Sequence, residues 1–207
     1  MKQSLQRYNI VLYPPADVRR KAVLVSRKLR EKKILFVLDD KTLIPHVTLY
    51  PVAFSQKDLP RVKALLKQIA AEAVPFQIIS STYRSDKGGY VNVGYKKSTR
   101  LHALQKQIIT QVNQLLHGRI KYPGKLRTNS MSMAEREAYK RYGYKHVGRS
   151  YYPHVTFTKF DTFRPTAFSG IPLERFSFKT DRIALCAMGE YGTCTGLIET
   201  FPVSKRK

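Results

Sequence analysis

The chain has 207 residues, of which 43% are hydrophobic, so it is long enough to bury a core as one domain of ordinary size. Its longest aliphatic and aromatic run, residues 34–38, is far shorter than the roughly 20 residues that span a bilayer, so no transmembrane helix is predicted. Lys and Arg number 38 against 14 Asp and Glu, and this net charge of +24 attracts polyanions and favours nucleic acid as a partner.

The first residues, 1–7, lead directly into a strand-like stretch and lack the apolar region of a secretory signal. We therefore expect a cytoplasmic protein. In that reducing compartment Cys186 and Cys194 are expected to be two free core thiols rather than a disulfide.

The first third of the chain predicts a strand, a helix, two strands and a helix. Alternation favours a strand over residues 7–14, and two prolines then precede a helix start at Ala16. Residues 34–38 are typical of a short buried strand, residues 39–41 of a turn, and residues 46–54 of a longer strand. Apolar residues at helical spacing predict the two helices; they are Val18, Ala22, Val25 and Leu29, then Leu59, Val62, Leu65, Leu66, Ile69 and Ala73.

In the next part, residues 76–83 and 90–95 predict two strands joined by a hairpin at residues 86–89, Asp-Lys-Gly-Gly, because glycine tolerates positive φ. A third helix follows, with one apolar face, made of Leu101, Leu104, Ile108, Val112, Leu115 and Leu116.

Residues 118–150 interrupt this pattern with a basic insertion that is rich in Gly, Lys, Arg, Tyr and Ser. Ser132 and Glu135 have capping-box spacing, which predicts a short helix to about Tyr142. Beyond the insertion, residues 151–160 predict a strand, and residues 181–203 predict a hairpin that turns near residues 189–192.

One tetrapeptide occurs twice, as Pro45-His46-Val47-Thr48 and Pro153-His154-Val155-Thr156, each on a predicted strand. A repeat of this kind indicates a duplicated strand and helix unit. No linker rich in Pro, Gly or Ser separates two independent domains. We therefore expect residues 1–207 to form a single bilobal α+β domain whose two antiparallel-sheet lobes are related by a pseudo-twofold axis.

In a strand, alternate side chains share a face, so His46 lies beside Thr48 and His154 beside Thr156. An imidazole gives or accepts a proton near neutral pH, and a threonine hydroxyl can donate to a phosphate oxygen. Two such pairs facing each other would supply a base, an acid and two phosphate donors without a metal ion.

Pro-His-Val-Thr-Leu and Pro-His-Val-Thr-Phe resemble the paired His-x-Thr-x motifs of the 2H phosphoesterase superfamily. Within it, the chain is most similar to the 2'-5' RNA ligase and RNA 2',3'-cyclic phosphodiesterase (LigT-like) branch. The resemblance implies two α+β lobes with outer helices around a central cleft, and action on 2',3'-cyclic phosphates or other nucleotide phosphodiesters. It assigns catalytic roles to His46, Thr48, His154 and Thr156.

Tyr50, Tyr152, Lys159 and Arg149 are weaker candidates for substrate binding, since they flank the motifs or share a face with them. The remaining histidines have no companion motif and are interpreted as non-catalytic; they are His102, His117 and His146. No cluster of His, Cys, Asp or Glu has metal-ligand spacing, and no glycine-rich phosphate loop is present, so we predict no metal and no cofactor.

The sequence therefore predicts a metal-independent phosphodiesterase of RNA 2',3'-cyclic phosphate ends, with 2'-5' RNA ligation as the possible reverse reaction. One alternative is a phosphodiesterase of cyclic oligonucleotides or small nucleotides. The other is a non-catalytic RNA-binding module, in which the charge and the tyrosines bind the RNA and the two motifs only hold a terminal phosphate. We expect RNA or a nucleotide phosphodiester as the partner, no membrane, and a monomer.

Overall fold

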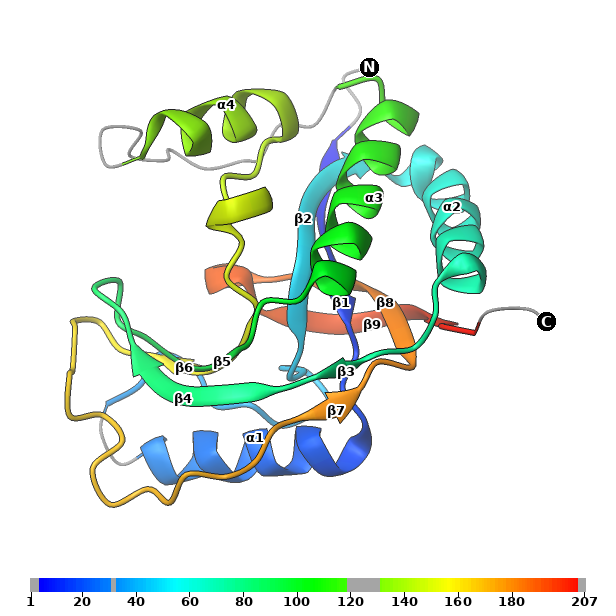
Figure 1. Ribbon diagram of the computed structural model, residues 1–207. Helices are drawn as coiled ribbons and strands as arrows, with labels where there is room; N and C mark the ends of the chain where they lie inside the picture. Colours follow the sequence, from blue (N-terminus) through cyan, green and yellow to red (C-terminus); the bar gives the residue numbers. More distant parts are fainter. Residues whose placement is uncertain (1–3, 31–32, 119–130, 205–207) are drawn as a thin grey trace.

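The computed structural model describes residues 4–30, 33–118 and 131–204 (Figure 1). Strands and helices alternate along most of this part of the chain. The strands are β1 (Leu5–Leu12), β2 (Val47–Ser55), β3 (Gln77–Ile78), β4 (Ser80–Ser85), β5 (Tyr90–Tyr95), β6 (His154–Lys159), β7 (Phe178–Lys179), β8 (Arg182–Met188) and β9 (Cys194–Pro202). The helices are α1 (Ala16–Leu29), α2 (Leu59–Glu72), α3 (Thr99–Leu115) and α4 (Met133–Tyr142).

The described strands form a seven-stranded antiparallel sheet in the order β4-β5-β6-β2-β1-β8-β9, with β3 and β7 as a separate pair. The large sheet has two halves, β4-β5-β6 and β2-β1-β8-β9. They join where β2 and β6, the two motif strands, meet at a single register pair, Val47 with Val155. The two repeated motifs therefore lie side by side at the centre of the sheet.

The register at this junction indicates a local twofold axis, because Val47 and Val155 hold the same place in the two motifs. Both strands also carry a β-bulge at equivalent positions. Leu49 is unpaired between Thr48 and Tyr50 in the ladder with β1, and Phe157 is unpaired between its neighbours in the ladder with β5. The α+β fold with two pseudo-twofold-related sheet lobes is thus as predicted.

Helices cover the two halves separately (Figure 1). Helix α1 packs against β6, whereas α2 and α3 contact each other and the other half, α2 on β8 and β9 and α3 on β2. The predicted helical faces are the buried ones in all three helices, including Val18 and Leu29 in α1, Val62 and Ile69 in α2, and Ile108 in α3.

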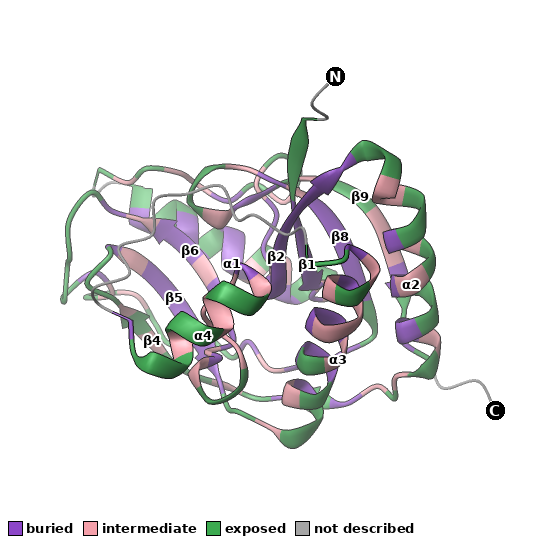
Figure 2. Cartoon of the chain, turned by 90° about the horizontal axis from the view of Figure 1, so that it is seen from above, coloured by how far each residue is buried: buried purple, intermediate pink, exposed green. Residues whose placement is uncertain are grey.

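The insertion contributes α4, which begins with the predicted capping box. The Ser132 hydroxyl accepts from the Glu135 N–H at 3.3 Å, and the Glu135 carboxylate accepts from the Ser132 N–H at 2.9 Å. The helix ends at Tyr142 and is capped by Gly143, whose φ of 66° favours glycine. No residue of α4 is buried, so it lies on the outside of the fold (Figure 2). Residues 119–130 of the predicted insertion lie outside the described residues.

The prediction of a strand over residues 34–38 is wrong. Ile34 makes one isolated bridge, to Phe160, next to which the Leu35 N–H donates to the Lys159 carbonyl at 2.8 Å, and two later backbone groups bond to side chains. The Leu38 N–H donates to the Ser26 hydroxyl at 2.9 Å, and the Thr158 hydroxyl donates to the Phe36 carbonyl. These hydroxyl groups replace the ladder partners that a strand would need. The predicted strand over residues 76–83 is likewise split, because β3 pairs with β7 and β4 pairs with β5.

The predicted C-terminal hairpin is formed by β8 and β9, which turn through residues Glu190–Gly192. Cys186 and Cys194 are both buried in it as free thiols, as predicted. None of the helices in the described part of the chain is long and apolar enough to cross a membrane.

Candidate active site

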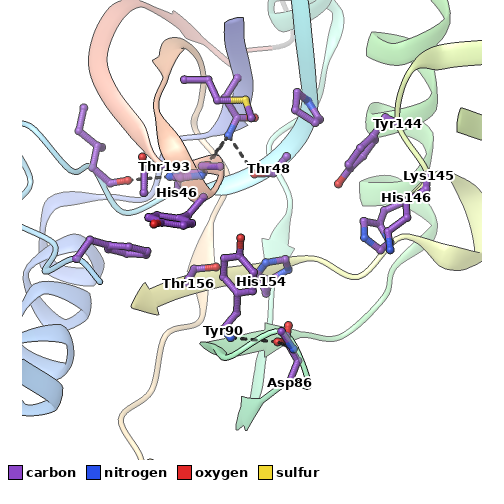
Figure 3. A pocket seen from close by; sticks show the side chains of 18 of the residues that line it. His46, Thr48, Asp86, Tyr90, Tyr144, Lys145, His146, His154, Thr156 and Thr193 are labelled. Atoms are coloured by element: carbon purple, nitrogen blue, oxygen red, sulfur yellow. Dashed lines mark hydrogen bonds between the residues drawn. The ribbon is translucent and has the colours of Figure 1, made fainter. Parts of the chain in front are cut away.

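The two motifs place their polar side chains in one pocket with a volume of about 620 Å³ (Figure 3). His46 immediately precedes β2, and His154 is the first residue of β6. Both histidines and the threonines two residues later, Thr48 and Thr156, line this pocket. The residues that follow each histidine and each threonine point to the opposite face and are fully buried, as strand alternation predicts; these are Val47, Leu49, Val155 and Phe157.

Both imidazole rings are held by the same hydrogen bond. His46 Nδ1 lies 2.7 Å from the Ile44 carbonyl oxygen, and His154 Nδ1 lies 2.7 Å from the Tyr152 carbonyl oxygen. Each carbonyl belongs to the residue two positions before its histidine. Because a carbonyl can only accept, Nδ1 carries the proton in the neutral rings, and Nε2 is the ring nitrogen at which a further proton can be taken up.

The surroundings of His46 include a buried amide that sequence reasoning missed. Asn9, on the neighbouring strand β1, is 1% exposed, and its Nδ2 lies 3.2 Å from both His46 Nε2 and the Thr48 hydroxyl oxygen. It also donates to the Gly192 carbonyl at 3.5 Å. Asn9 therefore links both polar groups of the first motif to the β8–β9 turn. An amide inside the apolar run of residues 8–12 was the available signal.

The surroundings of His154 differ. The Tyr152 ring stacks on the imidazole with centroids 5.2 Å apart, and its hydroxyl donates to Asn92 Oδ1 at 3.1 Å. The Arg84 guanidinium lies 5.2 Å from the centroid of the same Tyr152 ring. A Cβ atom on Gly94 would come within 2.5 Å of the Tyr152 hydroxyl, so glycine is needed for the ring to lie there.

The environment lowers the pKa of both histidines. Burial lowers the pKa of His46 to about 4, and the charge of His154 also lowers it. The hydrogen bond to the Ile44 carbonyl acts in the opposite direction and raises the pKa. Burial also lowers the pKa of His154, but the Tyr152 carbonyl and the Asp86 carboxylate oppose it. Both rings therefore favour the neutral form at neutral pH, and a nearby carboxylate supports the protonated form of His154.

Comparison with known proteins identifies the family. Residues 38–191 match the sequence model of the 2'-5' RNA ligase superfamily, and this span includes both motifs. The chain belongs to this superfamily. A search of curated proteins finds no match.

Solved structures with a similar fold are consistent with the superfamily assignment. TT0787 of Thermus thermophilus has a TM-score of 0.64 and 18% identity, covering 97% of this chain and 100% of that one. LigT of E. coli, in complex with 3'-AMP, has a TM-score of 0.58 and 14% identity, covering 98% and 100%. At these identities the likeness shows the fold alone. Membership of the superfamily supports a phosphoesterase-type activity.

In this superfamily member Tyr50 does not share the His46 face, contrary to prediction. The bulge at Leu49 shifts the alternation of β2 by one residue, so that Pro51 lines the pocket and Tyr50 is fully buried. The Tyr50 hydroxyl donates to the Tyr142 carbonyl at 2.7 Å, and burial raises the pKa of Tyr50. The Tyr50 side chain thus bonds to the insertion and does not form part of the pocket surface.

The other weaker candidates lie around the pocket instead of on its surface. Lys159 Nζ donates to the Phe160 carbonyl at 3.0 Å and lies 5.4 Å and 5.5 Å from the ring centroids of Tyr90 and Tyr191, which do line the pocket. The Tyr152 ring stacks on His154 and does not line the pocket. Arg149 is exposed, and its carbonyl accepts from Lys97 at 2.7 Å.

His146, which sequence reasoning grouped with His102 and His117, does line the pocket. It comes from the insertion, together with Tyr144 and Lys145 (Figure 3). Its sequence context gave no sign of this, because its position depends on how the insertion folds back over the motif strands. Among the residues that the structure describes, no three His, Cys, Asp or Glu side chains are grouped so as to hold a metal ion.

Proposed function

We propose that this superfamily member is a metal-independent phosphodiesterase that opens 2',3'-cyclic phosphates at RNA ends. One observation carries the proposal: His46 and His154 face one pocket, each tied at Nδ1 to a backbone carbonyl and each beside a threonine hydroxyl. Proton transfer then takes place at the two Nε2 atoms, one of which accepts a proton and the other donates it, and the Asn9 amide gives up its contact with His46 Nε2 when that atom is protonated. The net charge of +24 supports a polyanionic substrate.

In the proposed reaction one imidazole takes a proton from water, and the water oxygen forms a bond to phosphorus. The bond between phosphorus and one ribose oxygen breaks, and the second imidazole protonates that oxygen. Thr48 and Thr156 donate hydrogen bonds to the non-bridging oxygens, where negative charge increases in the transition state. The product is a phosphomonoester beside a free ribose hydroxyl.

The same groups can serve 2'-5' ligation, which is the reverse of cleaving a 2'-5' linkage to a cyclic phosphate. If a 5'-hydroxyl of a second RNA replaces water, its oxygen forms a bond to phosphorus and the bond between phosphorus and the 3' oxygen breaks. One imidazole takes the proton of the 5'-hydroxyl and the other protonates the departing 3' oxygen. The name of the superfamily, 2'-5' RNA ligase, fits this reaction. Whether the cyclic phosphate is hydrolysed or ligated depends on whether water or an RNA hydroxyl occupies the pocket.

The test is to incubate the protein, with EDTA present, with RNA ending in a 2',3'-cyclic phosphate and to follow the formation of the phosphomonoester. We expect turnover by the native chain and a loss of at least about 10²-fold in the double variant His46→Ala/His154→Ala. A requirement for a divalent ion, or a rate in the double variant close to that of the native chain, would contradict the proposal.

Two other functions give different results in the same assay. A phosphodiesterase of cyclic oligonucleotides or small nucleotides would turn over those compounds and leave the RNA ends intact. A non-catalytic RNA-binding module would bind RNA with a steep salt dependence and change neither substrate.

A further inference from the structure

The pocket has a second wall, which the paired motifs do not provide. Residues of the insertion line it opposite the motif strands, among them Tyr144, Lys145 and His146 (Figure 3). A volume of about 620 Å³ is in the range of pockets that hold a ligand of drug size, so there is room for more than the reacting phosphate.

This wall is fixed to the first motif strand by buried hydrogen bonds. Gln105 of α3 is 1% exposed, and its amide Nε2 lies 2.9 Å from the His146 carbonyl and 3.3 Å from the carbonyl of Leu49, the bulged residue of β2. The Tyr50 hydroxyl donates to the Tyr142 carbonyl at 2.7 Å. Both contacts hold carbonyl groups of the insertion. The segment is therefore positioned by its backbone, and its side chains line the pocket.

The side chains of the wall suit a nucleotide. Lys145 carries a positive charge, and His146 can donate a hydrogen bond to an anion. The rings of Tyr144 and His146 meet edge to face, with centroids 5.6 Å apart, so the two side chains form one contiguous surface. Burial lowers the pKa of His146, and the charge of Lys145 acts in the same direction.

We propose that Tyr144, Lys145 and His146 form a second subsite, which binds the internucleotide phosphate and the nucleoside next to the reacting end of an RNA chain. This rests on the proposed function and deepens it, because it names the substrate class as an oligonucleotide rather than a free nucleoside 2',3'-cyclic phosphate. In such a chain the adjoining phosphate is one nucleotide away from the phosphate held by the two motifs. Lys145 and His146 bind its oxygens, and Tyr144 packs against its nucleoside.

The experiment compares two substrates on the same protein: adenosine 2',3'-cyclic phosphate and a short RNA oligonucleotide ending in the same group. The measured quantity is the ratio of kcat/KM for the oligonucleotide to kcat/KM for the mononucleotide. Lys145→Ala and His146→Ala are expected to lower this ratio about tenfold or more, mainly through KM for the oligonucleotide, because each removes a contact to a charged phosphate. The mononucleotide also reports whether each variant is folded.

Lys140→Ala is the matched control, since Lys140 is an exposed lysine of α4 in the same insertion and does not line the pocket. Its ratio should equal that of the native chain. An unchanged ratio in Lys145→Ala and His146→Ala, or an equal fall in all three variants, would overturn the second subsite. If the native chain turns over neither substrate, it is the proposed function that fails.

Discussion

The two halves of the pocket are alike in their strands and different in what surrounds them. Each half has a histidine tied to the carbonyl two residues earlier, a threonine beside it and a bulge one residue beyond. His46, however, is bonded at Nε2 by the Asn9 amide, whereas His154 is stacked on Tyr152 and lies in the field of Asp86. The repeat provides the same chemical groups twice, and the neighbouring strands make the two imidazoles unequal.

The largest expected effect comes from removing either imidazole. His46→Ala and His154→Ala should each lower kcat on RNA 2',3'-cyclic ends by about 10²- to 10⁴-fold, because each removes a group that transfers a proton. The double variant should be little worse than either single one, since the two act as a unit. Single-turnover assays measure this. His117→Asn, at an exposed position with a φ of 52°, is the control and should keep full activity. Additive losses in the double variant would argue against a shared acid–base step.

Removing one phosphate donor should cost less. Thr48→Val and Thr156→Val keep the branched shape and lose the hydroxyl, and we expect kcat to fall about 10²-fold in each. Serine at the same positions should restore most of the rate, because it returns the donor. Equal rates for the valine and serine variants would show that the hydroxyl does not contact the phosphate.

Asn9→Ala and Asn92→Ala test whether the amide beside the first motif matters more for the rate than the amide beside the second. Asn9 contacts the first motif directly, whereas Asn92 reaches His154 only through Tyr152. Loss of two neutral hydrogen bonds should lower kcat about tenfold in Asn9→Ala. A smaller loss is expected for Asn92→Ala. Thermal denaturation of both variants separates changes in stability from changes in rate, and a larger catalytic loss for Asn92→Ala would reverse the comparison.

The smallest effect concerns pH. Both histidine pKa values are lowered, so the singly protonated pair exists mainly below pH 6.5, and kcat/KM should be highest on the acidic side of that value. The Asp86 carboxylate raises the pKa of His154, so Asp86→Asn should move the alkaline limb of the profile to lower pH. Asparagine keeps the Oδ1 acceptor for the N–H groups of Gly88 and Tyr90. A shift to higher pH would contradict this sign.

Much of the fold followed from local patterns. Helical spacing predicted α1, α2 and α3, and the capping box at Ser132 predicted α4. The motif strands presented their histidines and threonines to one face, because alternation holds up to the bulges. The same alternation failed at Tyr50, since a bulge depends on the register with a neighbouring strand, which sequence spacing does not contain.

The site was predictable in its repeated part and not in its unique parts. Asn9 is distant from His46 in the sequence and meets it only through the pairing of β1 with β2. His146 reaches the pocket because Gln105 holds its carbonyl, a contact between an insertion and a helix that no local pattern reveals. Such contacts arise from tertiary packing, and a single sequence carries little sign of them.

The local twofold axis between Val47 and Val155 bears on the direction in which a phosphodiester chain can lie in the pocket. Groups related by a twofold axis look the same to a phosphodiester from either side, so the paired motifs by themselves cannot distinguish the 5' sense of a strand from its 3' sense. Polarity has to be imposed by residues without a symmetry mate. Asn9 on one side and His146 on the other are such residues. A preferred orientation of a phosphodiester chain in this pocket must therefore come from these two residues and their surroundings, not from the repeat.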